Sequence, residues 1–371
     1  MSRRFQTFKM DGLSKLCPVI KEYWENGIFD EYSEEHFLIK AINNDVDFFR
    51  DFFLKKGFNM QYLSNFNVNF VINLNSKISC LRKYFGKKKI DSFIKHQFAA
   101  GKENYKEEAF FQALSEIHIL FFFLNFGPAL TQNAEYEPAF GVNDKNPEAR
   151  ILYKDDIVLD IEVKTPEFGK RSILENIIMP LVLLKKEGRD SLLNYCNKNS
   201  IVCYFPRVLK LIEFIKSAGE KFIPPDSKKH VNMLFINWSQ NNIKEMGLQE
   251  PISIICNNTN GIFKNMNVFE ELNFTMSELK KITAIFLYEF SEELLLFGDL
   301  RYIFKTKEYK IIMNPYADYA DADVVHKITH LAVNTIDEIG CDLNCFFNVE
   351  KNNWNNIFNN ILKIIDEYKI T

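Results

Sequence analysis

The sequence predicts an α/β protein in which helices pack against a mixed sheet. Two observations carry this prediction: one long helical pattern is followed by three strand patterns, and helices and strands then alternate up to residue 238. The expected elements, in chain order, are a helix at 103–126, strands at 134–140, 148–153 and 157–164, a helix at 172–187, a strand at 201–205, a helix at 208–217 and a strand at 231–238.

The region before this pattern, residues 1–100, is predicted to be mostly helical. Stretches such as 45–56 and 90–100 carry apolar residues at helical spacing with charged residues between them. The run at 68–72 is expected to form a short strand.

The helix at 103–126 begins with acidic residues, which the helix dipole favours, and ends at Gly127-Pro128. Residues 157–164 alternate as in a strand: Leu159 and Ile161 point one way, whereas Glu162 points the other. Residues 154–156 are expected to form the hairpin turn that precedes this strand.

The region after residue 240 gives a weaker pattern. Strands are expected at 252–256, 282–290 and 309–313, and helices at 322–339 and 353–369. The sequence therefore suggests three parts: a helical region at 1–100, a core at 101–240, and an α+β region at 241–371 that is either a second domain or an extension of the core sheet.

Composition limits the classes of function that this chain can have. The 371 residues carry a net charge of −3, which argues against a dedicated nucleic-acid coating protein and leaves room for a local basic surface. Seven irregularly spaced cysteines suggest reduced thiols. The N-terminus lacks an apolar signal segment, and the apolar run at 117–126 is too short to span a bilayer. We therefore expect a cytoplasmic protein without a membrane partner.

Ionisable residues at 160, 162 and 164 share one face of the third strand, and such charges are costly to bury. Alone, this pattern is typical of a solvent-facing strand. With a three-residue turn, however, Glu148 on the preceding strand falls opposite Glu162, whereas a two-residue turn would separate them. Two adjacent carboxylates repel each other unless a cation lies between them, and a hard divalent ion relieves this repulsion.

Three pieces of this sequence together resemble the PD-(D/E)XK nuclease superfamily: Pro147-Glu148, then Glu162-Val163-Lys164, and before them a helix that carries Glu116. Glu148 stands where the family usually has Asp and keeps the carboxylate. The resemblance covers about residues 105–205 and extends at most to 238. It implies a restriction-endonuclease-like core of the order αβββαβ, to which the residue patterns add a helical N-terminal region and an α+β C-terminal region.

The resemblance also implies roles for these residues. Glu148, Glu162 and the backbone carbonyl of Val163 would bind Mg²⁺, for which Mn²⁺ can substitute, and Glu116 would bind a second ion or hold a metal-bound water. Lys164 would orient the attacking water or stabilise charge on the phosphate. The implied activity is phosphodiester hydrolysis, with DNA favoured over RNA, in restriction or phage defence, and a homodimer is compatible with it.

Several alternatives stay open at this stage. Asp160 is a further candidate for the site, and Asp156 could replace Glu148 as the first acid. Thr165 and Lys170 are candidates for phosphate contacts. The basic stretch at 82–89 suits phosphate or base stacking contacts, and its alternative interpretation is a solvated helix end. Its candidate residues are Lys83, Lys87, Lys88 and Lys89.

Two other functions compete with an active nuclease. The chain could be a catalytically inactive protein that keeps the nuclease fold for nucleic-acid binding or assembly. Alternatively, residues 1–100 could form a sensor or partner-binding module that controls a nuclease core.

Overall fold

The computed structural model describes residues 15–63, 65–125, 131–140, 145–166, 176–238, 247–265, 275–297, 309–339, 345–348 and 354–370. The chain forms two compact units, each built from separate stretches. The first contains residues 1–136, 149–155 and 290–306, and the second contains residues 137–148, 156–289 and 307–371. The predicted division at residues 100 and 240 follows sequence order, whereas these units interleave along the chain.

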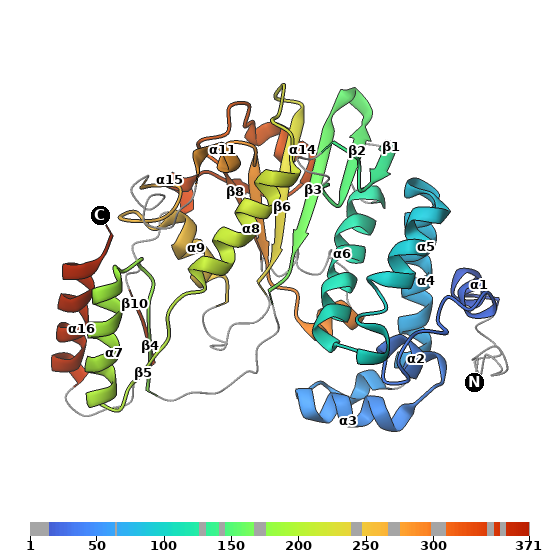
Figure 1. The fold of residues 1–371 in the computed structure, drawn as a ribbon, viewed down its shortest axis with the longest axis horizontal. Helices are drawn as coiled ribbons and strands as arrows, with labels where there is room; N and C mark the ends of the chain where they lie inside the picture. The colour runs from blue at the N-terminus through green and yellow to red at the C-terminus, as the bar shows by residue number, and fades with distance from the viewer. Residues whose placement is uncertain are drawn as a thin grey trace. The chain divides into compact units, whose positions relative to one another are not determined.

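The first unit is mainly helical, as expected for residues 15–100. Its helices are α1 (Pro18–Glu25), α2 (Phe37–Ile42), α3 (Val46–Lys56), α4 (Phe66–Phe85), α5 (Lys87–His96), α6 (Glu107–Asn125) and α12 (Glu292–Phe297), with short 3₁₀ turns η2 (Met60–Leu63) and η3 (Lys102–Asn104). Helix α4 packs against α6 (Figure 1). The antiparallel strands β1 (Thr131–Tyr136) and β2 (Ala149–Tyr153) complete the unit.

The predicted strand at 68–72 is wrong, because these residues lie inside helix α4. Phe66, Phe70, Leu74 and Ile78 recur at helical spacing and are all buried, so the helix places one apolar stripe against the core. Phenylalanine dominates this core: the ring of Phe37 stacks on Phe110 with centroids 5.4 Å apart. The high phenylalanine content therefore serves packing in the first unit.

The second unit holds the larger part of the sheet. Its strands β3 (Val158–Lys164), β6 (His230–Asn237), β7 (Ala284–Tyr288), β8 (Tyr309–Met313) and β9 (Val333–Asn334) are neighbours in that order. Strands β3, β6 and β7 are parallel, β8 is antiparallel to β7, and β9 is parallel to β8. The predicted α/β class with a mixed sheet is therefore confirmed.

Helix α8 (Val208–Lys221) connects to β6 and covers one face of the sheet (Figure 1). Its buried residues Leu211 and Ile215 share an apolar cluster with Leu234 and Ile236 of β6. The other helices of this part are α9 (Gln249–Cys256), α11 (Met276–Leu279), α14 (Ala322–Thr329) and α15 (Ile336–Ile339). This covering helix is the element that reaches the predicted site.

A second, smaller sheet takes two of its strands from the segment between β3 and α8 and a third from the region after residue 340. Strand β4 (Ile177–Pro180) is its centre and pairs with β5 (Val202–Cys203) and β10 (Cys345–Asn348). Helices α7 (Lys186–Lys198) and α16 (Trp354–Tyr368) pack against each other on it. The C-terminal segment thus completes a sheet that begins near the middle of the chain.

Most predicted elements of the core are present, and the errors have physical causes. The predicted helix at 172–187 is wrong where it is described: residues 177–180 form β4, and Pro180 would have interrupted a helix. The predicted strand at 252–256 is wrong because these residues belong to α9, whose Pro251 lies in the first turn, where proline is tolerated. The predicted helix at 322–339 is divided by His330, which adopts a left-handed conformation after α14. Within the ranges that the structure describes, every helix is too short or too polar to cross a bilayer.

Replacing Gly219 by Ala tests the packing of α8. A Cβ atom there would lie 2.5 Å from Cβ and 2.7 Å from the backbone oxygen of Glu278, at the start of α11. Helix propensity alone would make this change stabilising, so the clash decides the sign. We expect Gly219→Ala to lower the free energy of unfolding by about 1–3 kcal/mol, measured by urea denaturation. The control Ser217→Ala on the same helix should change it by less than about 0.5 kcal/mol, and an unchanged Gly219→Ala protein would contradict the close packing.

Candidate active site

The candidate site lies on the face of β3 that α8 covers. Alternation along β3 places Glu162 and Lys164 on this face, in register with Leu234 and Ile236 of the parallel strand β6. Leu234 and Ile236 belong to the apolar cluster under α8. Glu162 and Lys164 therefore lie next to apolar side chains. The alternative interpretation, an ordinary solvent-facing strand, is therefore wrong for Glu162 and Asp160, which are both fully buried.

The structure brings Glu148 and Glu162 together around an ammonium group. The Nζ atom of Lys221 lies 3.2 Å from Oε1 of Glu148 and 2.8 Å from Oε1 of Glu162. The Nζ atom of Lys164 lies 2.6 Å from the same Glu162 oxygen. Two carboxylates and two ammonium groups thus form one cluster, defined here as the charge quartet.

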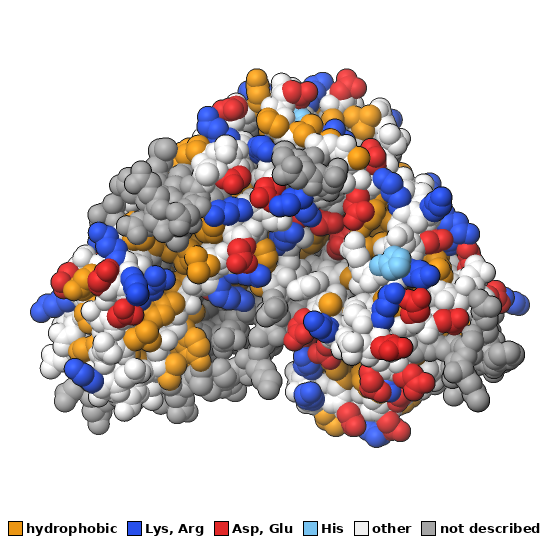
Figure 2. All heavy atoms as spheres, in the orientation of Figure 1, with side chains coloured by type: hydrophobic (Ala, Val, Ile, Leu, Met, Phe, Trp, Pro, Cys, Tyr) orange, Lys and Arg blue, Asp and Glu red, His pale blue; other side chains and the backbone are white. Residues whose placement is uncertain are grey.

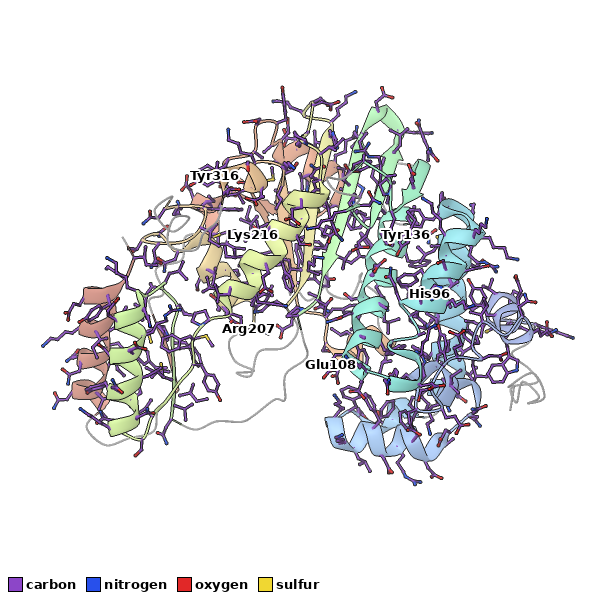
Figure 3. The ribbon with its side chains drawn as sticks, in the orientation of Figure 1. His96, Glu108, Tyr136, Arg207, Lys216 and Tyr316 are labelled. Carbon is purple, nitrogen blue, oxygen red and sulfur yellow. The ribbon has the colours of Figure 1, made fainter. Side chains whose placement is uncertain are left out.

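The predicted proximity of Glu148 and Glu162 is consistent with this geometry, but sequence analysis missed Lys221. The helix at 208–217 was expected to stop four residues before Lys221, whereas α8 continues to Lys221 as its last residue. Figure 3 labels Arg207 and Lys216, which mark the start and the middle of this helix. The helix C-terminus itself favours a cation, which is the signal that could have identified Lys221.

Neighbouring contacts fix the end of α8 against the segment that carries Glu148. Lys145 forms an ion pair with Glu220, directly before Lys221. On the other side, Nζ of Lys281 donates to the backbone oxygen of Gly219 at 2.8 Å and satisfies a carbonyl of the last helical turn. Two consecutive residues of α8 therefore pair with the segment at 145–148.

Burial dominates the electrostatics of Glu162. Its side chain is 0% exposed, whereas those of Glu148 and Lys221 are 14% and 19% exposed. Burial raises the pKa of Glu162 to about 7; Glu148 acts in the same direction, and Lys164 and Lys221 act against it. Burial alone would lower the pKa of Lys221, but Glu162 and Glu148 outweigh it and raise that pKa above its ordinary value.

The donor atoms fit a divalent cation in one respect. Oε2 of Glu162 is buried and has no hydrogen-bond partner among the described residues, so it is available as an oxygen ligand. The site supplies two side-chain ligands, and no group of three His, Cys, Asp or Glu residues within the described part of the chain could hold a metal ion. A divalent ion here would need Glu148, Glu162, the backbone carbonyl of Val163 and water, in the position that the ammonium of Lys221 now holds.

Glu116 lies in the first unit, on α6, and is buried. Its Oε1 atom accepts a hydrogen bond of 3.0 Å from the hydroxyl of Tyr136 at the end of β1, a residue labelled in Figure 3. His118, two residues further along α6, instead contacts the backbone oxygen of Leu295 through Nε2 at 2.9 Å. The separation of these two side chains around the helix agrees with their spacing, and a metal-related role for Glu116 stays a prediction.

The other acidic candidate on β3 has a different partner. Oδ2 of Asp160 lies 3.0 Å from Nε2 of His230 on β6, and both side chains are buried. His230 also approaches the exposed Asp226 through Nδ1, at 3.4 Å. Asp156 lies in the exposed 3₁₀ turn η5 (Lys154–Asp156). Lys170 lies outside the described residues, so its predicted phosphate contact stays a prediction, as does that of Thr165.

The basic stretch at 82–89 spans the end of α4 and the start of α5. Lys87 pairs with Glu22 at 2.5 Å, and Lys89 lies 3.7 Å from Glu135. Lys83 stacks over the ring of Tyr84 at 5.1 Å, and Lys88 is exposed. Figure 2 shows basic and acidic side chains interspersed on the face that carries α5. These pairs favour the solvated helix end over a continuous phosphate-binding surface, and the nucleic-acid contacts stay a prediction.

Comparisons with known proteins add no relative to these observations: no family model, curated protein or solved structure matches this chain. The chemistry of the charge quartet is therefore the basis for any functional conclusion.

The raised pKa of Glu162 predicts a pH-dependent stability. A carboxyl that titrates near 7 when folded and near 4.3 when unfolded keeps its proton longer in the folded state. Its stabilising contribution is complete below about pH 4 and is lost as the pH rises to about 7. Glutamine cannot titrate, so the stability of Glu162→Gln relative to the native protein should increase between these pH values, by a total on the order of 3 kcal/mol.

Urea denaturation of both proteins at a series of pH values measures this difference. The constant offset between them reflects lost ion pairs and is separate from the slope. A difference that stays flat would show that the pKa of Glu162 is ordinary, and one that falls as the pH rises would show that it is lowered; either result would contradict a raised pKa.

Proposed function

We propose that this protein is a Mg²⁺-dependent nuclease whose active site contains Glu148, Glu162 and Lys164. The observation that carries the proposal is that two carboxylates from separate segments meet at one cation, with a lysine on the same strand beside them. Phosphodiester hydrolysis needs relief of negative charge on the phosphate and a nucleophile near neutral pH, and this set of groups suits both needs.

The order of elements also supports the proposal. Helix α6 and strands β1, β2 and β3 follow one another in the order that the resemblance implies, but β4 stands where a helix was expected, and α7, β5, α8 and β6 come after it. Strands β3 and β6 are parallel, as a helical crossover between them requires. The order therefore supports the resemblance to PD-(D/E)XK nucleases up to β3 and in the parallel pairing of β3 with β6.

Each residue has a role in this proposal. Glu148, Glu162 and the backbone carbonyl of Val163 would hold Mg²⁺, which when bound supplies Lewis-acid activation and charge neutralisation. Lys164 would offer its ammonium to the phosphate or orient the attacking water. Lys164 and Lys221 favour the charged form of Glu162, but its burial outweighs them and leaves its pKa raised to about 7. The preference for DNA, and a role in restriction or phage defence, rest on the resemblance.

One observation favours a second function. The ammonium of Lys221 occupies the position between the two carboxylates where a catalytic cation would be needed. A salt-bridged site of this kind is also what a catalytically inactive protein would keep, with the same fold serving nucleic-acid binding or assembly.

Cleavage assays separate the two functions. Native protein is incubated with supercoiled plasmid, linear DNA, single-stranded DNA and RNA in Mg²⁺ or Mn²⁺. We expect cleavage of at least one DNA substrate that EDTA abolishes. Glu162→Gln and Lys164→Met should each lower the cleavage rate by about 100-fold or more, because each removes a charge next to the reacting phosphate.

The matched control is Lys210→Met, an exposed lysine of α8 that pairs with Glu213 one turn away. It should cleave at the native rate. Absence of cleavage on every substrate, or equal cleavage by native protein, Glu162→Gln and Lys164→Met, would reject the nuclease and favour the non-catalytic function.

A further inference from the structure

The charge quartet is electrically balanced when both of its carboxyl groups are ionised. Glu148 and Glu162 contribute two negative charges, and Lys164 and Lys221 contribute two positive charges, all within a few ångströms. Because Glu162 is fully buried beside apolar residues of β6, water screens these charges only weakly. A divalent cation added to this balanced cluster would meet two ammonium groups as well as two carboxylates.

The two lysines do not oppose a cation equally. Within the described part of the chain, the Lys164 ammonium forms an ion pair with Glu162, on the same strand. Lys221 bridges both carboxylates, so its Nζ atom occupies the volume that a shared metal ion needs. The carboxylates and a metal ion can therefore meet only if Lys221 moves, whereas Lys164 can stay.

We infer that Lys221 competes with a metal ion for Glu148 and Glu162. Its ammonium bridges the two carboxylates, and a divalent cation binds between them by displacing this ammonium. This inference rests on the proposed metal site and adds the regulation of that site. The displaced group has a path to water, because the Lys221 side chain is 19% exposed. It also has a favourable position outside the pair, since Lys221 is the last residue of α8 and the carbonyl end of a helix attracts a cation.

The competition has a direct consequence for affinity. In the native protein, metal binding would have to break two ion pairs of Lys221, one with the buried Glu162 and one with the partly exposed Glu148, and this cost lowers the affinity. Methionine has a similar length and no charge, so Lys221→Met leaves the two carboxylates without their bridging cation. We expect Lys221→Met to bind Mn²⁺ at least about tenfold more tightly than the native protein does.

Mn²⁺ binding is measured without nucleic acid, by titrating each protein and following the electron paramagnetic resonance signal of free Mn²⁺. Lys221→Arg keeps the bridging charge and should bind as weakly as the native protein. Lys210→Met, on the exposed side of the same helix, should also match the native protein. The double variant Lys221→Met, Glu162→Gln should lose the gain, which assigns it to the carboxylate pair.

Thermal unfolding gives a second readout and detects a variant that fails to fold. Lys221→Met should melt below the native protein without metal, because two carboxylates repel each other, and Mn²⁺ should raise its melting temperature more than that of the native protein. If Lys221→Met binds Mn²⁺ no more tightly than the native protein, and Mn²⁺ restores none of its stability, Lys221 does not compete with a metal.

The two proposals fail in different ways. Tighter Mn²⁺ binding by Lys221→Met without cleavage of any substrate would uphold the competition and reject the nuclease. Cleavage by the native protein, together with unchanged Mn²⁺ affinity in Lys221→Met, would uphold the nuclease and reject the competition.

Discussion

The site depends on one interaction, the contact of the Lys221 ammonium with the carboxylates of Glu148 and Glu162. A fully buried carboxylate such as Glu162 is costly unless a nearby cation offsets its charge. Lys221 supplies that charge from the end of α8, which in turn is fixed by its packing on β6 and by the Lys145–Glu220 ion pair. The apolar packing of the helix and the ionic contacts at its end are therefore parts of one arrangement.

The same arrangement connects stability with function. Ion pairs that satisfy buried charges also occupy the atoms that would bind a metal ion or a phosphate. Ion pairs that stabilise the empty site must therefore be broken before a ligand binds, and a site without these ion pairs would be less stable when it is empty. The pKa of Glu162 is raised because even two lysines do not fully offset the cost of burying its charge.

The sequence predicted the parts of this site that depend on local pattern. The alternation along β3 placed Glu162 and Lys164 on one face, and a three-residue turn would have placed Glu148 opposite Glu162. The observed connection, 154–157, has four residues, and Glu148 nevertheless meets Glu162 at Lys221. Lys221 could not be predicted in the same way, because its contact depends on where α8 ends and how the helix lies on β6. Strand β4 was also missed, since a short apolar run has no period that distinguishes a strand from a helix.

The small sheet has a consequence for how the protein is made. Its central strand β4 pairs on one side with β5, which follows soon after it, and on the other side with β10, which lies close to the C-terminus. During synthesis, the β10 side of β4 therefore stays unpaired until residues 345–348 have been made. An open strand edge can pair with other chains, so the addition of β10 also protects β4 from aggregation.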